Sequence, residues 1–132
     1  MQNILSKIFH TNNTKPANAI LKSFTAHFGR PINVEWHKEK ENYEALFYIE
    51  DIEHIALFSP DGRVIETKRN LLLSSAKPEI AKQALIVGEM MNLIEIERNG
   101  KFFYEIIARD LYLDRYYILL DNEGNMLDKR KL

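Results

Sequence analysis

The stretch LFSPDGRVIETKR, Leu57 to Arg69, is echoed later in the sequence by LLDNEGNMLDKRK, Leu119 to Lys131. Each copy runs from apolar residues into a four-residue turn that ends in Gly, and then through an apolar pair into acidic and basic residues. A glycine turn between two short apolar runs is typical of a β-hairpin. Because 132 residues contain this hairpin twice, the sequence predicts a tandem duplication.

Other features return at intervals of about 60 residues, and small insertions in turns explain a drift of one or two residues. Only two copies of a unit of that length fit in the chain. The recurring pairs are Tyr43-Glu44 with Tyr104-Glu105, Asp61-Gly62 with Glu123-Gly124, Lys15-Pro16 with Lys77-Pro78, and VEWHK at 34–38 with IEIER at 94–98.

Each copy begins with a helical pattern. ANAILKSFTAHF follows Pro16 and is itself followed by Gly29, and EIAKQALIVGEM follows Pro78. Proline starts a helix well, because its missing N–H would have no partner in the first turn. Apolar residues at helical spacing then predict helices over residues 16–28 and 78–90. The apolar residues of the second segment are Ile80, Ala81, Ala84, Leu85 and Val87.

Short strand patterns follow each helix. Val34 and Trp36 alternate with polar neighbours, which favours a core position for Trp36 under the first helix over a role as an exposed binding anchor. Asn99-Gly100 is the strongest hairpin signal, because both central residues of such a turn need positive φ. The segment LYLDRYYILL, residues 111–120, is rich in β-forming residues and is predicted as part of one long strand.

The sequence therefore predicts an α+β fold made of two tandem α-β4 repeats, which form an antiparallel sheet with the helices on one face. Short connections force neighbouring strands to run antiparallel. Two helices can cover only one face of the resulting sheet. We expect a single domain over residues 16–132, with repeats at 16–74 and 75–132.

The first copy, INVEWHKEKENYEALFYIED followed by IALFSPDGRVIET, resembles the PepSY-like family, which is related in fold to the beta-lactamase inhibitor proteins. The second copy keeps the scheme more loosely, with Ile94-Glu95-Ile96 in place of Val-Glu-Trp and with Tyr104-Glu105. The residues that carry the resemblance in the first copy are Phe28, Val34-Glu35-Trp36, Tyr43-Glu44-Ala45, Phe47, Leu57-Phe58 and Asp61-Gly62.

The resemblance covers residues 16–132. It implies two tandem α+β repeats, a curved antiparallel sheet, no catalytic residues, and a role in binding or inhibition. It also implies export to the periplasm or the cell surface. The N-terminus has no apolar run long enough for a signal peptide, which leaves a cytoplasmic location open.

Composition excludes several classes of function. The net charge of −1 gives no general electrostatic reason to bind nucleic acid or an anionic membrane. No apolar segment is long enough to span a bilayer. The chain has no Cys, so disulfides, thiolate chemistry and Cys-ligated zinc are excluded.

Histidine supplies the only candidate metal ligands besides carboxylates. His37 and His54 are expected on strands that could be neighbours, and a glutamate could complete a zinc site. No HxH or HxxxH spacing supports that site, so we predict no metal. The histidines are His10, His27, His37 and His54, and the glutamates considered are Glu35, Glu44 and Glu53.

Glu44 and Glu105 fall at equivalent repeat positions, which could indicate a pair of catalytic carboxylates. Carboxylates on a sheet surface beside Lys and Arg are far commoner. No glycine-rich phosphate loop and no nucleophile motif is present. The sequence therefore predicts no catalytic residue and no cofactor, and the protein is not expected to be an enzyme.

Apolar and aromatic residues fall on both faces of the predicted strands. A sheet covered by helices on one face should alternate more cleanly, so part of the second face should meet a partner. Tyr and Arg suit such a face because they give large contact area and keep polar tips in water. The predicted binding residues on this face are Leu46, Tyr48, Ile107, Arg109, Tyr112, Tyr116 and Tyr117.

We expect a non-catalytic binding or inhibitor-like module that presents this open face to a protein partner. The alternative is a homo-oligomer, such as a homodimer, that buries the face. A small-ligand carrier or an enzyme is the least supported hypothesis.

Residues 1–15 are interpreted as an N-terminal extension. Ile4, Leu5, Ile8 and Phe9 would form one apolar stripe of a short helix that could cover part of the second face. A disordered leader or a tag remnant is the other interpretation.

Overall fold

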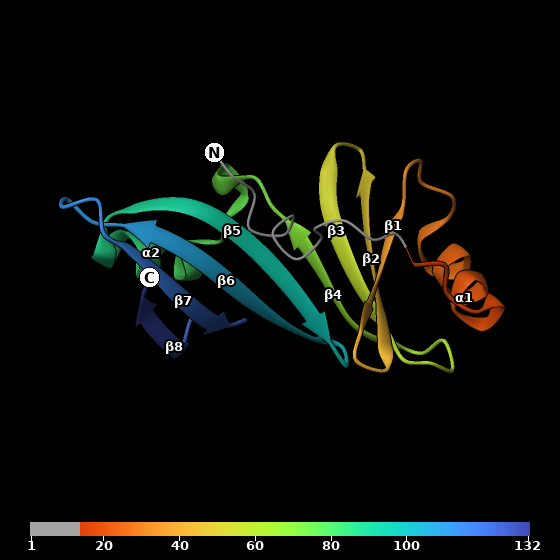
Figure 1. The fold of residues 1–132 in the computed structure, drawn as a ribbon. Helices are drawn as coiled ribbons and strands as arrows, with labels where there is room; N and C mark the ends of the chain where they lie inside the picture. The colour runs from red at the N-terminus through yellow and green to blue at the C-terminus, as the bar shows by residue number, and fades with distance from the viewer. Residues whose placement is uncertain (1–13) are drawn as a thin grey trace. The chain divides into compact units, whose positions relative to one another are not determined.

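A computed structural model describes residues 14–132, in two compact units. Unit 1 ends at Arg69 and unit 2 is Asn70–Leu132 (Figure 1). The division lies a few residues before the predicted one between residues 74 and 75. The helix expected within the extension, with Ile4, Leu5, Ile8 and Phe9, lies outside the described residues.

Unit 1 contains one helix followed by four strands. The strands pair antiparallel with their neighbours in chain order, as an open sheet. The elements are α1 (Asn18–Phe28), β1 (Glu35–Glu39), β2 (Asn42–Ile49), β3 (Ile52–Phe58) and β4 (Val64–Asn70).

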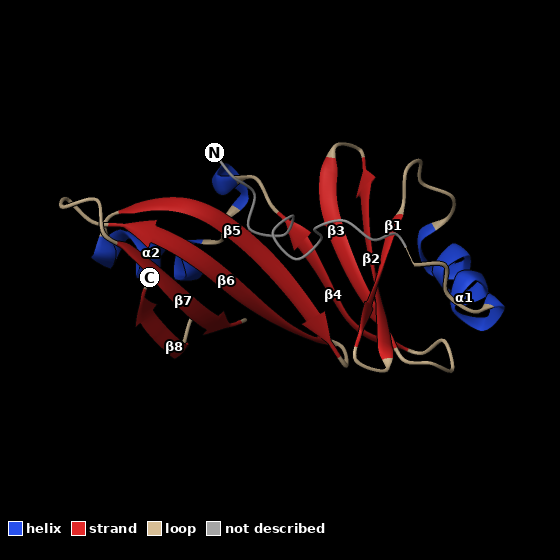
Figure 2. Ribbon diagram, in the orientation of Figure 1, coloured by secondary structure: helices blue, strands red, loops and turns tan. Residues whose placement is uncertain are grey.

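Unit 2 repeats this order after a short 3-10 turn, and its strands are again antiparallel (Figure 2). The elements are η2 (Leu73–Ser75), α2 (Pro78–Val87), β5 (Glu89–Arg98), β6 (Lys101–Arg109), β7 (Arg115–Asp121) and β8 (Met126–Lys131). The fold class is α+β, as predicted. A common helix-bearing face for the two helices stays a prediction.

Both helices lie close to their predicted places. α1 begins at Asn18, because Ala17 before it has an extended backbone, and Gly29 with φ of 74° ends it. α2 begins at Pro78 in the favoured first position and ends at Val87. It is shorter than predicted, because the backbone passes through Gly88 directly into β5.

The core of unit 1 is aromatic. Phe24 on α1 lies against Trp36 on β1, with ring centroids 5.3 Å apart and an edge-to-face geometry. Phe47 on β2 is fully buried and packs edge-to-face on Phe24 at 4.9 Å. The prediction that Trp36 packs under the first helix is confirmed. The buried cluster consists of Ile20, Phe24, Trp36, Ala45, Phe47, Ala56 and Phe58.

The core of unit 2 is mainly aliphatic. Ile80 and Ala84, one helical turn apart on α2, are fully buried against the strands. Leu85 lies on the other side of the helix and is exposed, in contrast to its predicted place in the apolar face. The buried cluster consists of Ile80, Ala84, Leu93, Tyr104, Ile106, Ala108, Ile118 and Leu120.

The middle hairpin has the same register in both units. Residues directly opposite each other in β2 and β3 have counterparts opposite each other in β6 and β7, so positions can be matched by pairing rather than by counting. The matched pairs are Tyr43–Phe58 with Tyr104–Leu120, Glu44–Leu57 with Glu105–Leu119, Leu46–Ile55 with Ile107–Tyr117, and Tyr48–Glu53 with Arg109–Arg115.

The predicted match of VEWHK with IEIER needs correction. Trp36 lies opposite Ala45, and Leu93 lies opposite Ile106, at the corresponding place in β6. Leu93 is therefore the counterpart of Trp36, whereas Ile96 points to the other face of the sheet. Counting failed because β5 has 10 residues where β1 has 5, and the β5–β6 hairpin continues further toward its turn, to Arg98 opposite Lys101, than the β1–β2 hairpin does.

A glycine in the last turn of each unit lies against the helix of that unit. A Cβ on Gly62 would be 2.8 Å from the carbonyl oxygen of Ala19, and one on Gly124 would be 2.5 Å from that of Glu79. Ala19 and Glu79 are each the second residue of their helix. We call these two contacts, Gly62 with Ala19 and Gly124 with Glu79, the glycine clasps. Each allows no side chain between turn and helix.

Candidate protein-binding faces

In each unit one face of the strands points away from the helix, and we call it the open face. Leu46 and Tyr48 alternate along β2 with Ala45 and Phe47, which belong to the core under α1. Leu46 and Tyr48 therefore lie on the open face of unit 1. By the same alternation with the core of unit 2, Ile107, Arg109 and Tyr117 lie on its open face.

Two of the predicted contact residues are not available as exposed surface. Leu46 is 6% exposed and Ile107 is 7% exposed. Leu46 lies between Glu35 and Ile55 on the neighbouring strands, and Ile107 lies between Asn92 and Tyr117. Cross-strand neighbours stand close enough to shield each other. The expected exposed apolar patch therefore needs correction at these two positions.

Tyr48 is the most accessible aromatic residue on the open face of unit 1. Its side chain is 52% exposed, and its hydroxyl donates a 2.9 Å hydrogen bond to Oε2 of Glu53 on β3. Burial first, and then the hydrogen bond to Glu53, raise the pKa of Tyr48. The ring is therefore held in place at one end while its face contacts solvent.

Glu53 is a buried carboxylate beneath that tyrosine. It is only 2% exposed, and its Oε1 atom has no hydrogen-bond partner among residues 14–132. Burial raises the pKa of Glu53, and the charge of Glu35 adds to the rise, whereas the bond from Tyr48 acts the other way. A buried carboxylate with one unpaired oxygen costs stability when it is ionised.

The open face of unit 2 carries cations instead. Nη2 of Arg109 lies 3.1 Å from Oε1 of Glu89 on the neighbouring strand. The guanidinium of Arg130 on β8 lies 4.5 Å from the ring centre of Tyr117. Burial, followed by the nearby charge of Glu105, raises the pKa of Tyr117 well above its usual range. Tyr117 therefore stays neutral and half-buried under an arginine.

The other two predicted tyrosines lie elsewhere. Tyr116 points to the opposite side from Tyr117, toward the face that carries Ile118 and the core. Tyr112 lies in the turn between β6 and β7, not in a strand. The segment LYLDRYYILL was predicted as strand throughout, but its first residues form a tight turn, and β7 begins only at Arg115.

The structure does not bring the two candidate histidines together. His37 lies opposite Glu44 on the open face, whereas His54 stacks on Phe47 at 5.3 Å on the helix side, so the two imidazoles point apart. Glu44 and Glu105 belong to different units. Within residues 14–132, no three His, Asp or Glu side chains are grouped so that they could hold a metal ion.

Sequence reasoning missed two features that bear on binding. Glu53 was considered only as a zinc ligand, although its place opposite Tyr48 follows once the tight turn at Glu50-Asp51 sets the register. The turn after β6 was hidden because it has no glycine. Its signal was the spacing of Asp110 and Asp114, which matches that of Asp121 and Asn125.

Comparison with known proteins gives a likeness at the level of structure alone. No family model and no curated protein matches the sequence. A Bacteroides eggerthii protein proposed to be periplasmic superposes with a TM-score of 0.81 at 14% identity, covering 89% of this chain and 90% of that one. A DUF2874 family protein from Bacteroides ovatus gives 0.78 at 16% identity, covering 89% of each chain.

A third solved structure, a BLIP-like protein from Bacteroides fragilis, gives a TM-score of 0.74 at 11% identity, covering 90% of this chain and 88% of that one. These likenesses support a BLIP-like fold. None of the three descriptions names an enzyme, and none names the PepSY-like family. Among the described residues, neither helix is long and apolar enough to cross a membrane.

Proposed function

We propose that this protein is a non-catalytic, inhibitor-like binding module that contacts a protein partner through the open faces of its strands. The observation that carries the proposal is the restraint of Tyr48, a half-exposed aromatic residue whose hydroxyl is fixed to the buried Glu53. Interfaces favour such side chains, because little conformational freedom remains to be lost on binding.

The open face of unit 2 supports the same proposal. Tyr117 is packed under Arg130, and Arg109 is paired with Glu89, so that aromatic and arginine side chains are again held by neighbours. Tyr and Arg are enriched among residues that dominate binding energy. The BLIP-like description of one structural neighbour is compatible with a protein-binding role.

The proposal includes the origin of the two units. We infer that they are copies of one α-β4 module of the PepSY-like kind, with export to the periplasm or cell surface as the expected location. The shared order of elements, the equal register of the middle hairpins and the two glycine clasps support this inference.

The test uses a photo-reactive benzoylphenylalanine at Tyr48 or Tyr117, in the cells that naturally make the protein. The matched control carries the same residue at Lys22, which is exposed on α1. We expect discrete adducts with a second kind of protein from positions 48 and 117 and none from position 22. Equal adducts from all three positions would refute the open faces as the binding surface. Adducts of twice the chain mass would instead favour a homo-oligomer.

A further inference from the structure

The turn between β6 and β7 exposes three consecutive large apolar residues. Leu111, Tyr112 and Leu113 are 96%, 86% and 68% exposed, and we call them the apolar tip. Figure 1 shows this turn at the end of unit 2, projecting past the strands that carry it. Turns usually hold Gly, Asn, Asp and Ser, so three such residues in water need an explanation.

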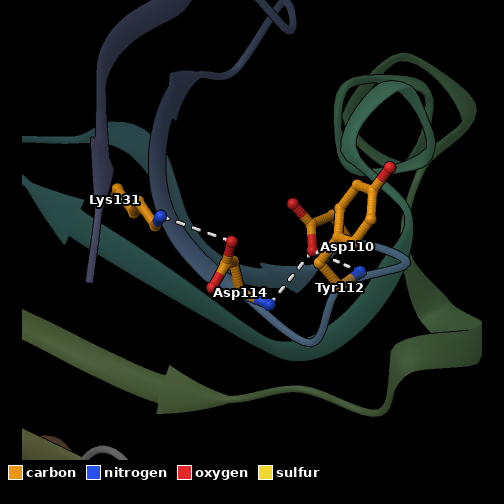
Figure 3. Close-up of polar contacts among 4 residues, drawn as sticks. All are labelled: Asp110, Tyr112, Asp114 and Lys131. Carbon is orange, nitrogen blue, oxygen red and sulfur yellow. Dashed lines mark hydrogen bonds and ion pairs between the residues drawn. The ribbon is translucent and has the colours of Figure 1, made fainter.

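The backbone under the tip is held rigidly. The Asp110 carboxylate accepts hydrogen bonds from the N–H groups of Tyr112 and Asp114, at 2.9 and 3.0 Å (Figure 3). Two backbone bonds close the turn, from Asp110 N–H to the Asp114 carbonyl and from Leu113 N–H to the Asp110 carbonyl. Lys131 on β8 pairs with Asp114 at 3.3 Å. The exposed side chains therefore stand on a fixed base.

The same turn occurs elsewhere in unit 2 with a polar tip. Between β7 and β8, the Asp121 carboxylate accepts the N–H groups of Glu123 and Asn125, both at 2.9 Å. The backbone bonds are equivalent, from Asp121 N–H to Asn125 and from Gly124 N–H to Asp121. The tip there is Asn-Glu-Gly. The hydrogen-bonded frame is thus formed without apolar residues, and Leu-Tyr-Leu adds nothing to it.

The apolar tip also carries backbone strain. Leu113 has φ of 67°, whereas Gly124 holds the corresponding place with φ of 89°. A non-glycine residue in the left-handed region costs about 1–2 kcal/mol. Gly124 is in addition buried against α2, whereas Leu113 is mostly exposed and gains no such packing. A strained, exposed residue of this kind points to a function outside the fold.

Further exposed apolar residues lie on the helix next to this turn. A Cβ on Gly88, which ends α2, would lie 2.3 Å from the Arg109 carbonyl oxygen and 3.2 Å from Cα of Asp110. The last turn of α2 therefore abuts the base of the β6–β7 turn. Leu85 and Ile86 in that last turn are both exposed.

We propose that the apolar tip is a docking element that inserts into an apolar concavity on a folded protein of a different kind. A rigid projection loses little entropy when it is bound, and a buried Leu-Tyr-Leu triplet would supply a central apolar anchor. The tip residues are not among the open-face residues, so either surface can fail its test without the other. Leu85 and Ile86 would lie at the rim of the contact.

The acidic residues beside the tip favour a protein over a membrane. Asp110 and Asp114 flank it directly, so only three residues could enter a bilayer before carboxylates met the lipid headgroups. Because Lys131 pairs with Asp114 and backbone N–H groups bind the Asp110 carboxylate, a protein pocket with a polar rim accommodates both the apolar tip and its base.

The experiment exchanges the two tips within one protein. A triple variant replaces the apolar tip with Asn-Glu-Gly and leaves Asp110 and Asp114 unchanged. Its substitutions are Leu111→Asn, Tyr112→Glu and Leu113→Gly. A photo-reactive benzoylphenylalanine at Tyr112 of the otherwise native chain identifies the contact in the cells that make the protein. The matched control is the same residue at Glu123, the corresponding position of the polar tip.

We expect adducts from position 112, but not from 123, that map to one apolar pocket of a single partner. The tip exchange should then weaken binding to that purified partner about 30-fold or more. The melting temperature of the triple variant should equal or exceed that of the native chain, because Gly relieves the backbone strain at position 113. If the triple variant does not fold, the single variant Leu111→Asn replaces it in the binding measurement, because Leu111 is almost fully exposed and its loss should not disturb the fold.

Three results would overturn the proposal. One is equal adduct formation at positions 112 and 123. A second is an adduct made of two copies of this chain. The third is flotation with vesicles of three parts phosphatidylcholine to one part phosphatidylglycerol that the tip exchange abolishes, since this would make the tip a membrane contact.

Discussion

Units 1 and 2 have the same order of elements but fill their cores with different side chains. Under α1 the core is built on Phe24, Trp36 and Phe47, whereas under α2 it is built on Ile80, Leu93 and Ile106. Trp36 and Leu93 occupy corresponding positions on their first strands. The comparison teaches that the positions of inward-facing residues, rather than their identities, fix how a helix meets the strands.

The largest expected effect tests the aromatic core. Phe47→Ala should lower the free energy of unfolding of unit 1 by about 3–5 kcal/mol, because the cavity lies among Phe24, Phe28 and His54. The single Trp of the chain, Trp36, lies in unit 1, so its fluorescence in a urea titration reports this unit.

The matched change in unit 2 is Ile106→Ala, with an expected loss of about 2–5 kcal/mol. It should shift the circular dichroism transition more than the Trp36 fluorescence transition. Equal shifts of both signals in both variants would mean that the two cores unfold as one, and the comparison between separate cores would fail.

The next prediction concerns the glycine clasps, where the units agree. Gly62→Ala and Gly124→Ala should each cost about 2–4 kcal/mol, because the new Cβ meets a helix carbonyl and the backbone has positive φ. Gly100→Ala is the control, with φ of 75° but nothing within 4 Å, and should cost about 1 kcal/mol. Thermal unfolding of the three variants measures the difference. Equal losses in all three would remove the clasp as a packing constraint.

A smaller effect, on the pH dependence of stability, is expected from Glu53 in unit 1. The pKa of Glu53 is raised by burial, so between its ordinary and raised values the folded state holds more protons than the unfolded state. The stability due to protonated Glu53 is complete below the ordinary pKa and is lost as pH rises through the raised one. Glu53→Gln should therefore be more stable than the native chain at pH 7, by about 1 kcal/mol.

At pH 4 the advantage of Glu53→Gln should vanish, because native Glu53 is then neutral as well. Urea titrations at the two pH values measure the change, with the exposed Glu41→Gln as control. A loss of stability in Glu53→Gln at pH 7 would mean that the ionised carboxylate is needed, and would contradict the prediction.

The smallest effect is expected on the open face of unit 2. Arg109→Ala removes an exposed ion pair with Glu89 and should change the free energy of unfolding by about 0.5 kcal/mol or less. Tyr48→Ala, at the matched position of unit 1, should cost about 1 kcal/mol for its bond to Glu53. Chemical denaturation checks both. A cost comparable to that of Phe47→Ala would make these residues structural and weaken the proposed binding role.

The sequence predicted those parts of the fold that depend on periodic patterns and turn residues. Trp36 was placed in the core by alternation with polar neighbours, and Asn99-Gly100 forms the predicted hairpin turn, with φ of 54° and 75°. Pro78 begins α2 in the first helical position, as its backbone preference requires. Each of these predictions depends on the residues of one short segment alone, so the sequence was sufficient to make it.

The remaining errors arose where tertiary structure decides. Leu85 was predicted on the apolar face of α2, but it directly follows the buried Ala84 and so lies about 100° around the helix from it, outside the stripe that Ile80 and Ala84 form. Tyr112 was assigned to a strand, because Leu113 stands where a glycine would have marked the turn. Leu46 was expected to be exposed, but the neighbours that shield it come from two other strands. For the candidate site, the sequence predicted the open-face positions of Tyr48 and Tyr117 but not the buried Glu53, and binding by these tyrosines stays a prediction.

The glycine clasps have a consequence for the order of folding. Each helix precedes, in the chain, the turn that fixes its first residues, and three strands lie between them. During synthesis α1 and α2 therefore appear before their clasps exist, with apolar faces that nothing yet covers. Closing such a long loop is slow compared with forming a hairpin. In each unit the strands should consequently pair first and the helix should pack on them last. A nascent chain stalled before Gly62 or Gly124 would then expose the apolar face of that helix to chaperones.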